Sequence, residues 1–248
     1  MAKFLKKLKG HSNSQVLLLQ ENDKVFVRKT GDISRNMERY DALARTHLRI
    51  PHIINYYGNS YDMEYIPNLD IKSYLSKNSV GALSEYLVNL MDFFAENSIE
   101  MNFLPIYEQK LNDFPFDRYH LPFTKNELIS KLPQYLPFSE YHGDLTLENI
   151  LYDVKDGQFV LIDPITTEYS SYVFDLAKLR QDLTCGWFIR NDNLYYESKL
   201  KVISEHLSKY VHFNNDYLLI LMLMRVLPYT QNTEDVDFLI SEIRRLWK

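Results

Sequence analysis

The length, composition and charge of the chain exclude several classes of protein. It has 248 residues, 46% of them hydrophobic and 25% charged, so it can bury a substantial core and is neither disordered nor fibrous. Its formal net charge is -5, which argues against a nucleic acid partner, because a phosphate backbone requires clustered cations. The single cysteine, Cys185, cannot pair within the chain and favours a reducing, cytoplasmic location.

The sequence contains no segment that predicts membrane insertion. The N-terminus has no apolar segment of the kind found in a secretory signal, and its lysines, between residues 3 and 9, are interpreted as a solvated face. The longest apolar stretch, from Tyr217 to Met224, ends at Arg225 and is far shorter than the ~20 residues of a membrane helix. We therefore predict a buried core helix there. No protein partner is evident.

The first part of the chain contains strand-like runs and one helical segment. Two short apolar runs flank a polar turn at 21–23, a pattern typical of an antiparallel hairpin. Apolar residues then recur at helical spacing from Ser34, the expected N-cap, until Ile50 and Pro51. The predicted strands lie at 4–8, 15–19, 24–29 and 59–66.

The remainder of the chain is predicted to be mostly helical. A second hairpin is expected around the turn at 153–157, whereas proline and aromatic residues obscure any pattern in 100–140. A strand-rich part thus precedes a helix-rich part, with the boundary near Pro67. The predicted helices lie at 83–94, 173–183, 196–210, 217–227 and 236–247.

Residues 142–149, which read HGDLTLEN, and Asp163 carry the pattern that indicates a chemistry. Phosphoryl transfer needs a carboxylate for the accepting hydroxyl, ligands for magnesium and cations for the phosphates. Asp144 precedes Asn149 by five residues, as in the kinase catalytic loop, and Asp163 follows at the end of a predicted strand. Residue types of this kind also cap ordinary turns, but the complete string favours catalysis.

Residues 141–175 resemble the aminoglycoside phosphotransferase and choline kinase family, relatives of protein kinases whose catalytic loop reads H-G-D-x-x-x-x-N. The resemblance implies an α+β, two-lobed, protein-kinase-like fold. A small antiparallel-sheet lobe would span 1–66 and end in a hinge, and a mostly helical lobe would span 67–248. ATP and Mg²⁺ would be the cofactors, and a small-molecule hydroxyl, on a sugar, aminoglycoside or choline-like amino alcohol, would accept the phosphoryl group. Bacterial kinases of this type often serve cell-surface polysaccharide or antibiotic-modification pathways.

The resemblance also implies roles for five residues in and after this loop. Asp144 would take the proton of the acceptor hydroxyl, and Asn149 and Asp163 would bind magnesium, a hard cation that prefers oxygen ligands. His142 would brace the loop. Asp175 would be a buried carboxylate that hydrogen-bonds the loop from the following helix.

The N-terminal part resembles the family more loosely. Lys29 is similar to the strand lysine that holds the α- and β-phosphates, and Val27, on the same strand face, would cover the adenine. Arg28 is the alternative, because only the strand register distinguishes the two. Glu38, on the following helix, would position the lysine or else simply face solvent.

Two further segments are candidates for nucleotide binding. Residues 10–14, including Ser12 and Asn13, would cover the phosphates, although the glycine motif of protein kinases is absent. Backbone groups of Glu64 and Ile66 would read the adenine edge at the hinge, unless this segment is only an edge strand. ATP and GTP both remain open as the nucleotide.

Departures from the kinase pattern leave alternatives. Gly143 replaces the arginine of protein kinases, no activation segment follows Asp163, and Thr146 stands where many kinases have a lysine, so a protein substrate is disfavoured. A nucleotide-binding pseudokinase that acts as a partner-binding module is the first alternative. A metal-dependent hydrolase that uses His142, Asp144 and Asp163 is the second.

Overall fold

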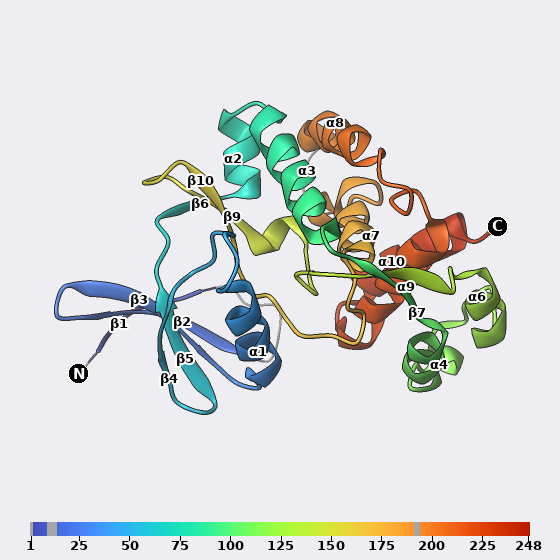
Figure 1. The fold of residues 1–248 in the computed structure, drawn as a ribbon, viewed down its shortest axis with the longest axis horizontal. Helices are drawn as coiled ribbons and strands as arrows, with labels where there is room; N and C mark the ends of the chain where they lie inside the picture. The colour runs from blue at the N-terminus through green and yellow to red at the C-terminus, as the bar shows by residue number, and fades with distance from the viewer. Residues whose placement is uncertain (1, 9–13, 191–193) are drawn as a thin grey trace. The chain divides into compact units, whose positions relative to one another are not determined.

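The computed structural model describes residues 2–8, 14–190 and 194–248, which group into two compact units. The first unit comprises Met1–Lys77 and Glu148–Thr167, and the second comprises Asn78–Leu147 and Glu168–Lys248. The chain therefore returns to the strand-rich unit after residue 147. The division of the chain into lobes at 66 and 67 remains a prediction. Figure 1 shows the elements of both units.

A five-stranded antiparallel sheet forms most of the first unit, with strand order β1-β2-β3-β5-β4 (Figure 1). The predicted hairpin of β2 and β3 is confirmed, and Asn22 and Asp23 at its tip have left-handed φ values of 48° and 65°. Asn and Asp tolerate this conformation, which matches the twist of a two-residue hairpin. The strands are β1 (Lys3–Lys7), β2 (Gln15–Glu21), β3 (Lys24–Thr30), β4 (Ile53–Tyr56) and β5 (Ser60–Glu64).

One helix, α1 (Ser34–Leu43), packs on this sheet through a cluster that includes Val27, Tyr40 and Met63. The expected N-cap is wrong, because Ile33 occupies that position and no side chain caps the helix. The helix also ends seven residues before Ile50. The Thr46 hydroxyl donates to the Leu43 carbonyl at 2.7 Å, which satisfies a free carbonyl of the last turn.

A second sheet completes the first unit and provides the strand that leads to Asp163. Its antiparallel strand order is β10-β9-β6, and Tyr74 of α2 packs against the rings of Tyr152 and Phe159. The second predicted hairpin is therefore confirmed. The elements are β6 (Asn68–Asp70), α2 (Ile71–Lys77), β9 (Ile150–Asp153) and β10 (Gln158–Leu161).

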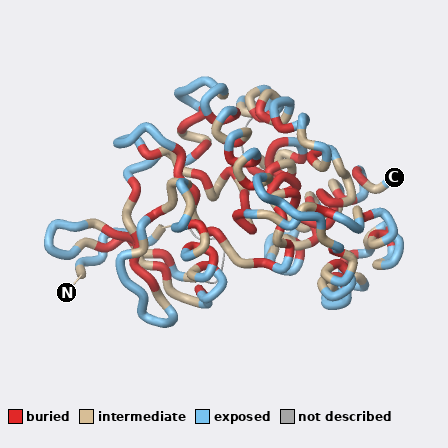
Figure 2. Tube along the Cα trace, in the orientation of Figure 1, coloured by how far each residue is buried: buried red, intermediate tan, exposed pale blue. Residues whose placement is uncertain are grey.

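The second unit is mainly helical, and its core contains α7 and α9. Every residue from Leu218 to Met224 is buried, which confirms the predicted core helix (Figure 2). The Asn215 side chain caps α9 by accepting from the N–H groups of Tyr217 and Leu218, both at 3.0 Å. The long helices are α3 (Gly81–Ala95), α7 (Tyr172–Leu183), α8 (Glu197–Leu207), α9 (Asp216–Val226) and α10 (Thr233–Leu246).

Residues 100–140, for which the sequence predicted no element, form short helices and a two-stranded sheet. Thr124 and Glu127 form a reciprocal capping box at the start of α6, and Phe103 and Tyr107 are buried in the core of the unit. Tertiary packing thus stabilises elements too short to stand alone. These are β7 (Ile99–Asn102), α4 (Leu104–Asn112), α5 (Phe116–Tyr119), α6 (Lys125–Lys131) and β8 (Tyr135–Phe138).

Together these elements give the α+β class that was expected. The sheets are antiparallel and largely precede the helices in the chain. Within the described residues, no helix is both long enough and apolar enough to span a lipid bilayer.

Candidate functional site

A lysine and an aspartate 134 residues apart form an ion pair in the first unit. The Lys29 ammonium donates to a carboxylate oxygen of Asp163 at 2.9 Å. The lysine side chain is only 6% exposed, whereas the carboxylate is 34% exposed. Two residues predicted to handle phosphates and magnesium are therefore in contact, and the carboxylate keeps an accessible face.

Asp163 has an unusual backbone conformation that its neighbours stabilise. Its φ is 54°, in the left-handed region that non-glycine residues seldom adopt. Its N–H donates to the Tyr40 hydroxyl at 3.1 Å, and the next carbonyl, of Pro164, accepts from the Asn36 amide at 2.8 Å. Helix α1 thus fixes the direction in which the Asp163 carboxylate points.

Asn149 lies beside the same segment of the first unit. The N–H of Ile162, the residue before Asp163, donates to the Asn149 carbonyl at 3.0 Å. The two residues predicted to bind magnesium therefore come from neighbouring stretches of backbone. Both offer oxygen atoms, the donor type that Mg²⁺ requires.

In the second unit, Asp175 holds the loop that carries Asp144. Its buried carboxylate accepts from the N–H groups of His142 at 2.5 Å, Gly143 at 3.0 Å and Leu145 at 3.3 Å. Burial raises the pKa of Asp175, although the three N–H groups favour its charged form. Gly143 has a φ of 92°, which only glycine adopts readily.

His142 is fully buried at the start of this loop. Its Nδ1 accepts from the N–H of Asp144 at 3.3 Å. An Nδ1 atom that accepts a hydrogen bond carries no proton, so this contact selects the tautomer with the proton on Nε2. His142 and Asp175 thus both bind backbone N–H groups of the loop, and their role in support of the site remains a prediction.

The Asp144 carboxylate is paired with a lysine that the sequence reasoning did not identify. Lys178 Nζ lies 2.9 Å from Asp144 Oδ1, and the lysine side chain is 9% exposed whereas that of Asp144 is 41% exposed. Burial raises the pKa of Asp144, but the positive charges of Lys178 and then Arg225 outweigh this effect and lower the pKa to about 2. Asp144 is therefore an ionised, fixed and accessible carboxylate at neutral pH.

The spacing of polar residues on α7 contains a signal that would have identified Lys178. Asp175, Lys178 and Asp182 are all buried and follow one another at three and four residues, so they share one face of the helix. Asp182 accepts from the N–H of Leu147 at 2.7 Å. A polar stripe on an otherwise buried helix thus serves the loop from His142 to Leu147.

The register of β3 places Arg28 and Lys29 on opposite faces. Arg28 makes a bidentate pair with the buried Asp62, at 2.6 and 2.8 Å, and its guanidinium lies 5.0 Å from the Tyr57 ring centroid. Lys29 instead contacts Asp163. Arg28 therefore has a structural partner, and of the two bases Lys29 is the one placed beside a predicted metal ligand.

For four other predicted residues, the described part of the structure shows no contact that supports the predicted role. Val27 is 4% exposed in the apolar cluster of the sheet, so its contact with adenine remains a prediction. Glu38 is exposed on α1. Among the described residues, Lys29 pairs with Asp163 and not with Glu38, which was predicted to position it. Ser12 and Asn13 lie outside the described residues.

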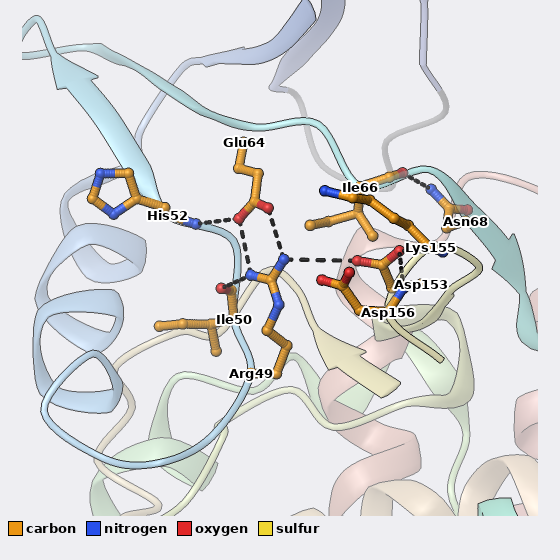
Figure 3. A network of polar contacts seen from close by, with 9 residues as sticks. All are labelled: Arg49, Ile50, His52, Glu64, Ile66, Asn68, Asp153, Lys155 and Asp156. Carbon is orange, nitrogen blue, oxygen red and sulfur yellow. Dashed lines mark hydrogen bonds and ion pairs between the residues drawn. The ribbon is translucent and has the colours of Figure 1, made fainter. Parts of the chain in front are cut away.

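The segment predicted to be a hinge is held by Arg49 (Figure 3). The guanidinium donates to both carboxylate oxygens of Glu64, at 2.7 and 2.9 Å, and lies 3.7 Å from the buried carboxylate of Asp153. The carbonyl of Ile66 accepts from the Asn68 amide at 2.7 Å. Arg49 thus ties the end of β5 to the end of β9.

This network makes Arg49 important for stability above pH 4. Hydrogen bonds from Arg49 lower the pKa of Glu64, so their contribution is complete above the unfolded pKa, near 4.3, and is lost as the pH falls through the lower folded value. Arg49→Met also leaves Asp153 without its cation. We expect a loss of about 1–3 kcal/mol at pH 7 in urea unfolding, smaller at pH 3.

Arg45→Met is the control for this measurement, because Arg45 is exposed and lies, like Arg49, on the segment that follows α1. It should change the free energy of unfolding by less than about 0.5 kcal/mol. Equal losses for the two variants at pH 7 would show that the Arg49 network does not stabilise the fold.

The described residues contain no cluster of three or more His, Cys, Asp or Glu side chains arranged to hold a metal. A magnesium site of the nucleotide-dependent type needs only one or two protein ligands, because phosphate oxygens supply others. Asn149 and Asp163 fit that smaller requirement.

Two of the comparisons with known proteins give no match. No protein-family model matches the sequence, and no curated protein does.

Solved structures do match, over nearly the whole chain. A thermostable mutant of the aminoglycoside phosphotransferase APH(4)-Ia, in a ternary complex with ADP and hygromycin B, is 10% identical, with a TM-score of 0.68 over 98% of this chain and 92% of that one. Ethanolamine kinase from Plasmodium vivax is also 10% identical, with a TM-score of 0.63 over 99% and 82%. LicA in complex with AMP is 14% identical, with a TM-score of 0.60 over 99% and 93%.

These likenesses agree with the resemblance that the catalytic-loop sequence indicated. Because the identities are low, what they establish is the fold. The chain accordingly has the two-lobed, α+β, protein-kinase-like fold of the aminoglycoside phosphotransferase and choline kinase group.

Proposed function

We propose that this protein is an ATP- and Mg²⁺-dependent kinase that phosphorylates a hydroxyl group of a small molecule. The observation that carries the proposal is the ion pair between Lys29 and Asp163, which brings together a phosphate-binding cation and a metal-binding carboxylate from distant parts of the sequence. The solved structures with this fold support it, since two of them hold ADP or AMP and one holds hygromycin B.

Asp144 is the residue that receives the proton in this reaction. The acceptor oxygen attacks the γ-phosphorus and forms a new P–O bond, while the bond from that phosphorus to the β–γ bridging oxygen breaks and ADP leaves with the electron pair. The hydroxyl proton passes to the Asp144 carboxylate. Because Lys178 keeps this carboxylate ionised and in one position, it is ready to accept the proton at neutral pH.

The phosphates are held by Lys29 and by the metal ligands in this proposal. Bound Mg²⁺ would neutralise charge on the β- and γ-phosphates, and Asn149 and Asp163 would hold it. Lys29 would exchange its contact with Asp163 for the α- and β-phosphates. The carboxylate of Asp163, already 34% exposed, would then be available to the metal.

Lys29→Met tests the phosphate-binding role. We expect kcat/KM for ATP to fall by about 10²–10³-fold, because one cation that stabilises phosphate charge is removed. Steady-state rates at varied ATP concentration provide the measurement. Lys24→Met, at the exposed start of the same strand, is the control and should keep the wild-type value. A similar kcat/KM in both variants would show that Lys29 does not bind phosphates.

The activity itself is tested by ADP release with ATP and Mg²⁺ over a panel of sugars, sugar acids, sugar phosphates, amino alcohols and aminoglycosides. Stimulation by one acceptor, with a phosphorylated product seen by mass spectrometry, supports the kinase. Nucleotide binding without transfer to any acceptor would instead support the pseudokinase alternative. Turnover with Mn²⁺ or Zn²⁺ but no nucleotide would support the hydrolase.

A further inference from the structure

The backbone that follows β10 exchanges hydrogen bonds with helix α1. The N–H of Thr166 donates to the Arg35 carbonyl at 2.9 Å, and Arg35 Nε donates to the Thr166 carbonyl at 2.7 Å. The buried Asn36 amide donates to the Pro164 carbonyl at 2.8 Å. Helix α1 therefore holds the backbone directly after Asp163 at two positions.

Tyr40, one turn after Asn36 on the same face of α1, binds the backbone of Asp163 itself. Its hydroxyl accepts from the Asp163 N–H at 3.1 Å and donates to the Met63 sulfur at 3.8 Å. The residue is 1% exposed, and its ring packs edge-on against Tyr61 with centroids 5.8 Å apart. Packing of the ring thus fixes the hydroxyl as an acceptor for the Asp163 N–H.

Asp163 needs such an acceptor because local preferences oppose its conformation. Its φ of 54° is in the left-handed region, which non-glycine residues seldom adopt. It also precedes Pro164, and the residue before a proline favours extended backbone. The N–H of Ile162 is bound separately, by the Asn149 carbonyl at 3.0 Å. Relaxation at Asp163 would therefore turn its carboxylate relative to Asn149, the other predicted magnesium ligand.

In this chain α1 contacts the predicted metal ligand and not the predicted phosphate-binding lysine. Glu38, the residue of α1 expected to reach Lys29, is exposed, and among the described residues Lys29 pairs with Asp163 at 2.9 Å. The position of α1 is thus linked to Lys29 through Tyr40 and Asp163.

We propose that Tyr40 is a positioning residue for Mg²⁺ binding, because its hydroxyl holds Asp163 in the conformation that binds the metal. The inference rests on the proposed kinase function and adds a residue that acts through Asp163. When Lys29 moves to the phosphates, Asp163 loses its ion pair. The hydrogen bond to Tyr40 does not involve the carboxylate, so it keeps Asp163 in place while the metal replaces the lysine.

Tyr40→Phe tests this role, because it removes the hydroxyl and keeps the ring that packs against Tyr61. Calorimetry measures the affinity for a non-hydrolysable ATP analogue, once with Mg²⁺ and once with EDTA. We expect Mg²⁺ to tighten binding by the wild type. This gain should be about tenfold smaller in Tyr40→Phe, since residues that orient metal ligands typically contribute that much to metal affinity. The affinity in EDTA should be unchanged.

Tyr56→Phe is the matched control, because Tyr56 lies on β4 of the same sheet and is 54% exposed. It should keep the full gain from Mg²⁺. Hydrogen–deuterium exchange without ligands gives a second measurement. The amides of residues 162–166 should exchange faster in Tyr40→Phe than in the wild type, whereas those of β2 and β3 should not.

The outcomes separate this inference from the proposed function. Binding of the analogue needs no acceptor, so the test holds whether or not a phosphorylated product is found. If Mg²⁺ does not tighten binding by the wild type, the metal role of Asp163 in the proposed function fails, and the role of Tyr40 with it. If the wild type shows the gain and Tyr40→Phe keeps it in full, only the role of Tyr40 is overturned.

A general structural role for Tyr40 would give a different result. Tyr40→Phe would then lose the same affinity with Mg²⁺ and with EDTA, and its amides would exchange faster throughout the sheet. Either observation would overturn the proposal.

Discussion

Replacement of Asp144 by asparagine is expected to lower kcat by about 10²–10⁴-fold, the usual contribution of a positioned general base. Asparagine has the same shape but cannot accept the hydroxyl proton. Affinity for ATP should change little, because Lys29, Asn149 and Asp163 all belong to the first unit. Turnover is followed by ADP release, and nucleotide affinity by calorimetry.

Asp237→Asn is the matched control, since Asp237 is an exposed carboxylate on α10 of the same helical unit. It should retain wild-type kcat. An Asp144→Asn variant with more than about a tenth of the wild-type kcat would refute the assignment of the base. Because the pKa of Asp144 is about 2, protonation of this group should not reduce wild-type activity between pH 8 and 5.

Asp175→Ala is expected to give the largest loss of stability. The carboxylate accepts from three backbone N–H groups, and its removal leaves these buried donors without a partner. Loss of hydrogen bonds to a charged group of this kind should cost about 3 kcal/mol or more. For a chain of this size, that loss lowers Tm by roughly 6–12 °C. Thermal and urea unfolding provide the measurement.

Asp175→Asn should lose less, because its carbonyl oxygen still accepts one or two of these bonds. Asp237→Ala again serves as the control and should stay within about 0.5 kcal/mol of wild type. If the loop is positioned by Asp175, the asparagine variant should lose kcat while its KM for ATP is retained. A folded Asp175→Ala variant with wild-type Tm would show that the carboxylate does not hold the loop.

Local pattern predicted most of the regular elements. The two hairpins and the buried helix α9 follow from apolar runs bounded by turn residues, information that lies within a few neighbouring positions. The segment 100–140 had no such pattern, because its short helices are stabilised by burial of Phe103 and Tyr107 in the core of the unit. The end of α1 was also mispredicted, since Thr46 terminates a helix whose apolar spacing continues.

The contacts of the candidate site were less predictable than its residues. The sequence favoured Lys29 over Arg28 but did not exclude Arg28, and only the structure showed that Arg28 pairs with Asp62. Lys178 was overlooked, although its spacing from Asp175 places both on one face of α7. The direction in which α7 presents that face depends on how the helix packs.

The sequence by itself determined that a carboxylate at Asp144 is followed by candidate oxygen ligands at Asn149 and Asp163, because order and spacing are properties of the chain. Only the tertiary structure decided that Lys29 contacts Asp163 and that Lys178 contacts Asp144. These charges come from segments far apart in the chain. Their distances, and so their effects on pKa, are set by packing that no local pattern encodes.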